Sequence, residues 1–207
     1  MKRDWNNIKW IFEPDGALRD IYVQEVSLRD WKNLTDLINE KYTVIYEGEK
    51  KIAKQDVIEY LTDKTGEVEC KTVSIELEKI QLNCHFFLED EIEFDIDPKQ
   101  INSLEDFELV EKFMIDLSKS LDNQITLTYE NDSKFPLVKI DVNRGVNRIL
   151  TEEEVKEYWG DPNSFINKMK SFKIKAEMKL TPNRFKEKLL KSANEVHKST
   201  KKDENVW

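Results

Sequence analysis

The chain has 207 residues, of which 36% are charged and 39% hydrophobic, and its formal net charge is −9 at pH 7. This length fits one large domain or two small ones, with enough apolar residues to bury a core. The longest apolar runs are far shorter than the roughly 20 residues that a membrane-spanning helix needs. The N-terminus turns polar before any apolar stretch of signal length appears, so we expect a soluble, cytoplasmic protein without membrane contacts.

Charge is distributed unevenly along the chain. Residues 1–167 hold 21 Lys and Arg against 37 Asp and Glu, whereas residues 168–202 hold 12 against 3. We therefore predict an acidic α+β body over residues 1–142 and a basic C-terminal α/β extension over residues 148–207, with a soft boundary around Gly145. Two interpretations stay open: the extension packs on the body as one domain, or the two present opposite binding surfaces.

The first half of the chain predicts a mixture of strands and helices. Pro14, Asp15 and Gly16 supply turn chemistry, which predicts an opening β-hairpin. Ser27, with Asp30 three residues later, is typical of a helix start. The predicted elements are strands over 6–12 and 18–26, a helix from Ser27, a strand over 42–46, a helix over 52–61, a strand over 68–77 and a bulge or turn at Lys79.

The clearest pattern runs from Ile80 to Asp97. Apolar residues occupy alternate positions, which is typical of half-buried strands and predicts an antiparallel hairpin. The inward positions are Ile80, Leu82, Cys84, Phe86, Leu88, Ile92, Phe94 and Ile96. Cys84 is expected to be a buried thiol. The acids of the hairpin are expected on a solvated face and form the predicted partner-binding patch, which consists of Glu89, Asp90, Glu91, Glu93, Asp95 and Asp97.

The second half continues the same alternation of elements. Ser103 is the predicted N-cap of a helix that reaches Leu121, and its apolar face should cover the hairpin. The elements predicted beyond it are strands over 124–129 and 137–142, a helix from Thr151 to about Trp159, a strand over 172–180 and a helix from Thr181. The sequence thus predicts an α+β fold, with largely antiparallel sheet or sheets and helices packed on one face.

Chemistry-bearing motifs are absent from the sequence. There is no GxSxG, GxGxxG, P-loop, CxxC or HExxH pattern, so we expect no cofactor, no metal and no catalytic residue. His85 is expected to be a surface histidine. The acidic row leaves a metal-dependent hydrolase or nuclease as an alternative, although same-face positions on one strand lie about 7 Å apart. The basic C-terminal segment favours nucleic acid only weakly, because the acidic body would repel a polyanion.

Two stretches carry a resemblance to known proteins. These are WIFEPDGALRDIYV, residues 10–23, and the segment from Asp90 to Asp141. They resemble small uncharacterised bacterial proteins, several of which are similar to the immunity partners of polymorphic or contact-dependent toxins. The resemblance implies a stoichiometric inhibitor without chemistry of its own, whose acidic patch binds a basic toxin domain. A self-associating structural or regulatory module is a further alternative, and the sequence does not fix the oligomeric state.

Overall fold

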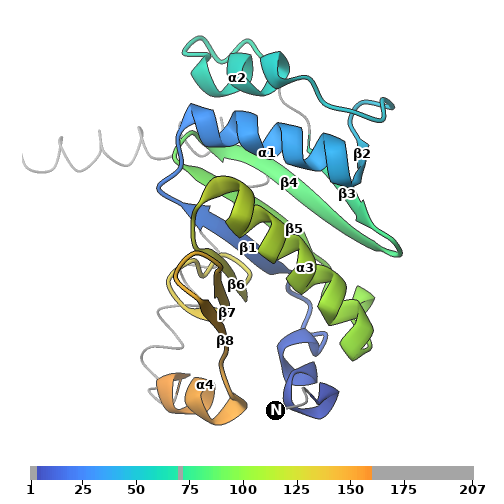
Figure 1. The fold of residues 1–207 in the computed structure, drawn as a ribbon, viewed down its shortest axis with the longest axis vertical. Helices are drawn as coiled ribbons and strands as arrows, with labels where there is room; N and C mark the ends of the chain where they lie inside the picture. The colour runs from blue at the N-terminus through green and yellow to red at the C-terminus, as the bar shows by residue number, and fades with distance from the viewer. Residues whose placement is uncertain (1–3, 70–71, 160–207) are drawn as a thin grey trace, which may run out of the picture. The chain divides into compact units, whose positions relative to one another are not determined.

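The computed structural model describes residues 4–69 and 72–159, whose elements belong to one compact unit that ends at Tyr158 (Figure 1). Eight antiparallel strands form one sheet in the order β2-β3-β4-β5-β1-β6-β7-β8, which confirms the α+β prediction. The strands are β1 Arg19–Gln24, β2 Thr43–Ile45, β3 Val73–Leu77, β4 Ile80–Leu88, β5 Glu91–Ile96, β6 Ile125–Tyr129, β7 Pro136–Asp141 and β8 Val146–Ile149. The helices are η1 Trp5–Asn7, η2 Lys9–Phe12, α1 Leu28–Lys41, α2 Lys54–Thr62, η3 Pro98–Gln100, α3 Leu104–Leu121 and α4 Glu152–Trp159.

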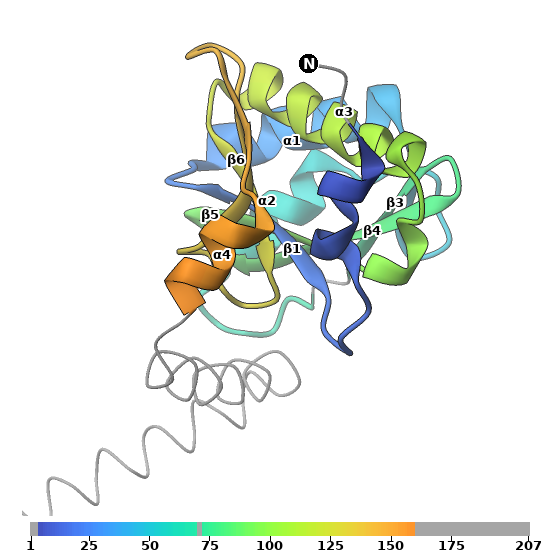
Figure 2. The same cartoon turned by 90° about the horizontal axis from the view of Figure 1, so that it is seen from below.

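Helices α1 and α3 lie side by side on one face of the sheet, as Figures 1 and 2 show. Phe113 of α3 meets Phe94 of β5 edge-on, with ring centroids 5.2 Å apart, so α3 covers the apolar face of the hairpin as predicted. Trp31 of α1 packs on Phe86 of β4 at 5.3 Å. Burial of these aromatic rings is a main source of the core's stability. None of the helices in the described ranges combines the length and apolar composition that crossing a membrane requires.

The two long helices begin where the sequence predicts. The main-chain N–H of Ser27 donates to the Asp30 carboxylate at 2.9 Å, which satisfies a donor at the start of α1. The Ser103 hydroxyl accepts from the N–H of Asp106 at 3.2 Å at the start of α3. Helix α3 ends at Leu121, and the capping residue Asp122 has a φ of 50°, the left-handed conformation typical of helix C-terminal caps.

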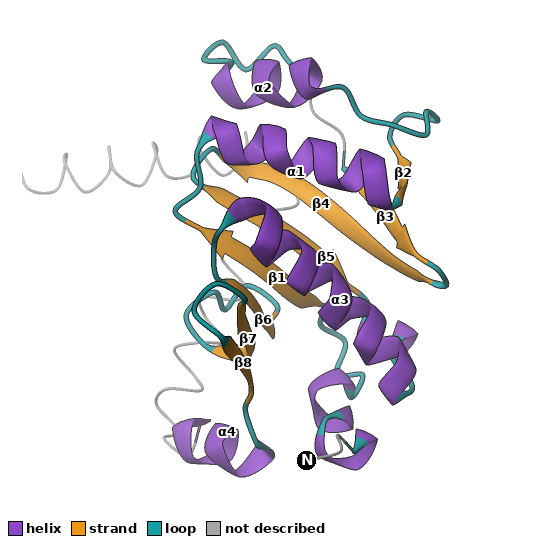
Figure 3. Cartoon of the chain, in the orientation of Figure 1, coloured by secondary structure: helices purple, strands orange, loops and turns teal. Residues whose placement is uncertain are grey.

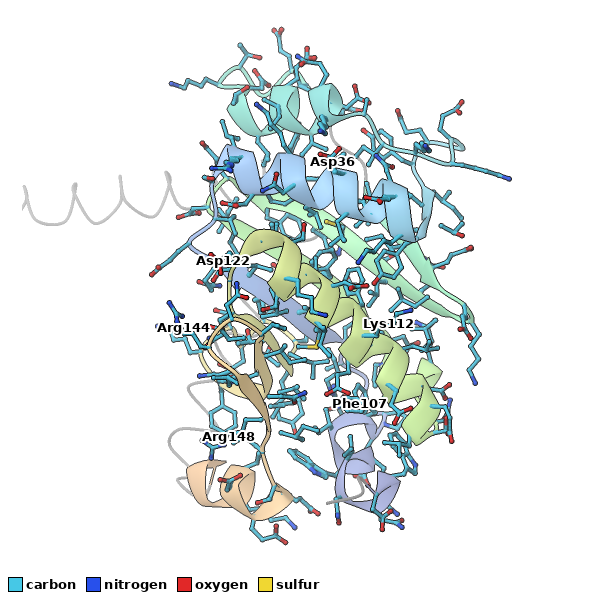
Figure 4. All side chains as sticks on the ribbon, in the orientation of Figure 1. Asp36, Phe107, Lys112, Asp122, Arg144 and Arg148 are labelled. Carbon is cyan, nitrogen blue, oxygen red and sulfur yellow. The ribbon has the colours of Figure 1, made fainter. Side chains whose placement is uncertain are left out.

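The predicted N-terminal strand over residues 6–12 is wrong. These residues form two short 3₁₀ helices instead (Figure 3). The buried residues Ile8, Ile11 and Phe12 recur at helical rather than alternating spacing. Phe12 packs on Phe107 of α3, which Figure 4 labels, with ring centroids 5.9 Å apart. Strand β1 has no free side for an N-terminal partner, since it pairs with β5 and β6.

Strand β8 was not predicted from the sequence. The soft boundary around Gly145 is a hairpin turn that joins β7 to β8, and Gly145 takes a φ of 66° there. Asp141 pairs with Val146 directly across this turn. The division into residues 1–142 and 148–207 stays a prediction. The predicted strand over 172–180 and the helix from Thr181 lie outside the described residues.

Candidate functional site

The six predicted acids do not form one solvated row. Glu89 and Asp90 are exposed in the β4–β5 turn, and Glu91 and Asp97 are partly exposed, with Asp97 capping η3. Glu93 and Asp95, however, are buried, and each residue is only 6% exposed. The expectation of a continuous wet acidic face is therefore wrong at its centre.

Sheet order places these two acids among polar side chains of the neighbouring strands. Strand β5 lies between β4 and β1, so each of its side chains has a neighbour on both sides. Asp95 stands opposite Asn83 and Asp20, at the distance of about 5 Å at which cross-strand side chains interact. Glu93 stands opposite His85 and Tyr22 in the same way. The hairpin's own sequence does not reveal that β1, far away in the chain, flanks this face.

These six residues form what we term the buried polar network: Asp20, Tyr22, Asn83, His85, Glu93 and Asp95. Its centre is Asp95, which accepts from the Asn83 amide at 2.8 Å and lies 2.5 Å from Nε2 of His85. His85 is thus not the surface histidine that the sequence predicts, since it is largely buried and paired. A short contact of this kind fixes the imidazole ring in one orientation.

Tyr22 and Asp20 form the second part of the network. The Tyr22 hydroxyl donates to the Asp20 carboxylate at 2.8 Å, and the same carboxylate oxygen accepts from the N–H of Asn131 at 2.6 Å. Burial, with the nearby charges of Asp20 and Glu93, raises the pKa of the Tyr22 phenol well above its ordinary value. Tyr22 therefore stays protonated and remains a hydrogen-bond donor to Asp20.

The alternative of a metal-dependent hydrolase or nuclease needs a cluster of metal ligands, and none is present among the residues that the structure describes. Across 4–69 and 72–159, no group of three or more His, Cys, Asp and Glu side chains is arranged to hold a metal ion. Cys84 is buried in β4, as predicted.

The β4–β5 turn carries a second arrangement, which we term the hairpin tip and define as residues Phe87–Glu91. His85 pairs with Glu93, but Leu88 pairs with Glu91, so β4 contains one more residue than β5 between these pairs. This is a β-bulge, and it moves Leu88 to the face that Glu91 occupies. The inward position predicted for Leu88 is therefore wrong: Leu88 is 51% exposed, and Phe87 beside it is 42% exposed.

Contacts to the rest of the fold hold the hairpin tip in place. The indole N–H of Trp31 donates to the main-chain oxygen of Glu89 at 2.9 Å. The N–H of Val26 donates to the main-chain oxygen of Asp90 at 3.0 Å. The ring of Phe87 stacks on that of His85, with centroids 4.8 Å apart and an interplanar angle of 5°. The tip is thus a preformed surface and needs little ordering on binding.

A shallow depression of about 680 Å³ lies elsewhere, around the loop that joins β2 to α2. Its walls mix cations with anions, and none of the six predicted acids contributes to it. The residues that line it are Asn39, Tyr46, Glu47, Glu49, Lys50, Lys51, Ile52, Ala53 and Asp56. It is therefore separate from both the buried polar network and the hairpin tip.

The apolar part of the hairpin tip was missed by sequence reasoning. Strict alternation places Leu88 in the core, and a bulge leaves no mark in the hydrophobic pattern. The only available signal was the acidic triplet that follows Leu88, which marks the turn.

Fold and site together define a mixed α+β protein with an eight-stranded antiparallel sheet and a preformed acidic and apolar hairpin tip. No protein-family model, curated protein or solved structure matches this chain. The resemblance to toxin immunity proteins accordingly stays a prediction.

Proposed function

We propose that this protein is a non-catalytic binding module of the bacterial cytoplasm, an immunity-type inhibitor that blocks a basic toxin domain. The observation that carries the proposal is the hairpin tip, where the exposed acids Glu89 and Asp90 adjoin the exposed apolar side chain of Leu88. Protein interfaces commonly combine an apolar centre with a charged rim. The hairpin tip combines an apolar side chain with acids in one short turn, whose backbone is held by hydrogen bonds.

The charge of the tip suits a cationic partner. Acids at the rim of an interface mainly raise the association rate and select against wrong partners, because they act over distance before contact. The same charges disfavour nucleic acid, whose phosphates they repel. Glu93 and Asp95 are buried and belong to the fold, and Asp97 caps η3 beyond the other end of β5. The binding patch that we propose therefore keeps Glu89, Asp90 and Glu91 from the predicted six.

The test reverses the two exposed charges of the β4–β5 turn, in the variant Glu89→Lys with Asp90→Lys. The side chains of both residues are exposed, so reversal should leave stability within about 0.5 kcal/mol of the wild type. The matched control reverses two exposed acids on α1 and α3, Glu40→Lys and Glu108→Lys, which changes the net charge equally.

The wild-type chain is expected to retain one basic protein in near-equal amount from a lysate of its native cells. For that purified partner, the tip variant should associate about tenfold more slowly at low salt and lose most of the salt dependence, whereas the control should bind like the wild type. Toxicity of the partner should be suppressed by the wild type in co-expression. Equal association of both variants, or a partner that is not toxic, would contradict the proposal.

A further inference from the structure

Strand β8 is the last strand at one end of the sheet, and among residues 4–69 and 72–159 no strand pairs with its other side. The N–H of Leu150 donates to the main-chain oxygen of Leu137 at 2.9 Å, which fixes the residues of β8 that face β7. The direction of the main-chain groups alternates along an antiparallel strand. Arg148 therefore faces β7, whereas the N–H and C=O groups of Asn147 and Ile149 point away from the sheet.

The opposite end of the sheet is closed by the chain itself. Strand β2 runs into a tight turn, where the main-chain groups of Tyr46 and Glu49 bond to each other at 2.9 and 2.8 Å. By the same alternation, the main-chain groups of Val44 also point away from β3. Val44 is 0% exposed, however, so these groups are out of a partner's reach. Strand β8 differs, because Asn147 and Arg148 are exposed, and an exposed edge strand is a place where another strand can pair.

The charges beside this edge select the kind of strand that fits. Lys139 of β7 stands directly opposite Arg148, and like charges at this spacing are unfavourable. A carboxylate on an added strand, opposite Arg148, would be next in the same row and would offset this repulsion. Arg148 donates to Glu154 at 2.6 Å, which uses one of the five N–H donors of its guanidinium. Arg148 therefore has donors left for a second carboxylate.

A second copy of the chain does not supply this carboxylate. Antiparallel pairing of two β8 strands brings their outward main-chain groups together in three registers. The residue that then stands opposite Arg148 is Val146, Arg148 or Leu150 of the copy. The basic residues 168–202, with 12 Lys and Arg against 3 Asp and Glu, are an equally poor source of it. The charge row thus favours a strand from a different protein.

We propose that β8 is a strand-addition site, at which an extended acidic segment of another protein pairs with the outward groups of Asn147 and Ile149. The segment places a carboxylate opposite Arg148 and an apolar side chain opposite Ile149, which is partly exposed. In this mode of recognition, main-chain hydrogen bonds supply affinity and alternate side chains supply specificity. The inference is independent of the proposed function, because it involves no residue of the hairpin tip.

Hydrogen exchange in the full chain tests whether the edge is open. The amides of Asn147 and Ile149 should exchange at least about tenfold faster than the amide of Arg148, which faces β7. Slow exchange of all three amides at every protein concentration would mean that the chain covers its own edge. Slow exchange that is lost on dilution would mean that a second copy covers it. Either result overturns the inference.

A phage-displayed library of random peptides, selected on the full chain, tests the chemistry of the added strand. The enriched peptides should share an Asp or Glu next to an apolar residue. A synthetic peptide of this sequence should slow exchange at Asn147 and Ile149, and its binding should weaken about tenfold when its acid is replaced by Lys. Enrichment of no peptide, enrichment without acids, or protection elsewhere in the chain overturns the inference.

Two variants tie peptide binding to β8. Asn147→Pro removes an N–H that points away from β7, so the β7–β8 pairing is kept, and it should weaken binding about tenfold. The matched control Asn147→Ala loses the same side-chain bond to Glu111 but keeps the N–H, and should bind like the wild type. Arg148→Glu should also weaken binding about tenfold, and melting curves check that each variant folds. Wild-type affinity in a folded Asn147→Pro or Arg148→Glu overturns the inference.

Discussion

Arg19 offers the sharpest test of how the N-terminal segment is attached to the sheet. Its side chain is 1% exposed and lies in β1, between β5 and β6. The guanidinium donates to the main-chain oxygens of Ile11 at 2.6 Å, Leu18 at 3.0 Å and Glu13 at 3.0 Å. The variant Arg19→Met keeps an apolar side chain of similar length but removes every one of these donors.

The expected loss of stability follows from the carbonyl groups that remain. A hydrogen bond to a charged group contributes about 1.5–3 kcal/mol, and a buried acceptor left without its donor carries a cost of similar size. Three such bonds, each taken at the lower end, give about 4–5 kcal/mol. The ion pair with Asp15 adds little, since that carboxylate is 48% exposed and pairs of this kind contribute roughly 0–1 kcal/mol.

Urea unfolding followed by tryptophan fluorescence measures this loss, with Asp15→Asn as the matched control. Arg19→Met should lower the unfolding free energy by about 4–5 kcal/mol, whereas Asp15→Asn should cost at most about 1 kcal/mol. Hydrogen exchange at the Ile11 amide, which bonds to Ile8, should accelerate in the first variant. A loss below about 1 kcal/mol for Arg19→Met, or equal losses for the two variants, would refute the reasoning.

Two further predictions concern pH and the hairpin tip. Burial raises the pKa of Asp116, but hydrogen bonds from Lys41 and Tyr42 outweigh the effect of burial. The pKa of Asp116 therefore lies below its ordinary value. The contribution of ionised Asp116 to the free energy of unfolding is therefore present above about pH 4 and is lost as the pH falls through the lowered pKa. In urea unfolding, the difference in stability between the wild type and Asp116→Asn should shrink below about pH 4. A difference that stays constant with pH would contradict this prediction. Trp31→Phe removes the hydrogen bond to the Glu89 main-chain oxygen and should lower the free energy of unfolding by about 1–3 kcal/mol. Hydrogen exchange of the Val26 amide, measured by NMR, should become faster. Unchanged exchange would show that Trp31 does not hold the hairpin tip.

Elements with strong local patterns were predictable from the sequence. Helices α1 and α3 combine an apolar stripe with a cap at Ser27 or Ser103, so spacing and cap agree on where each begins. The alternation of apolar and polar residues predicts the β4–β5 hairpin. The N-terminal segment lacked such agreement, because a short run with Ile8, Ile11 and Phe12 fits a strand or a helix turn equally well. Only contact with α3 decides in favour of the helix turn.

Features that depend on distant partners were not predictable. Glu93 and Asp95 stand opposite Tyr22 and Asp20 because β5 pairs with β1, some seventy residues away in the chain. Strand β8 has too little alternation to be recognised, and it exists because β7 offers a free edge next to the turn at Gly145. In each case the deciding interaction is non-local, whereas sequence patterns report local geometry.

A single inserted residue divides the hairpin's outer face into a buried part and an exposed part. On the Asp95 side of the bulge, regular pairing with β1 and β4 gathers acids into a buried polar network, where their charge serves the fold and is out of a partner's reach. On the Leu88 side, the shifted register exposes apolar side chains among the acids of the turn. Leu88 at 51% exposure is therefore the part of this hairpin on which the proposed binding function depends, whereas Glu93 and Asp95 belong to the packing of the sheet.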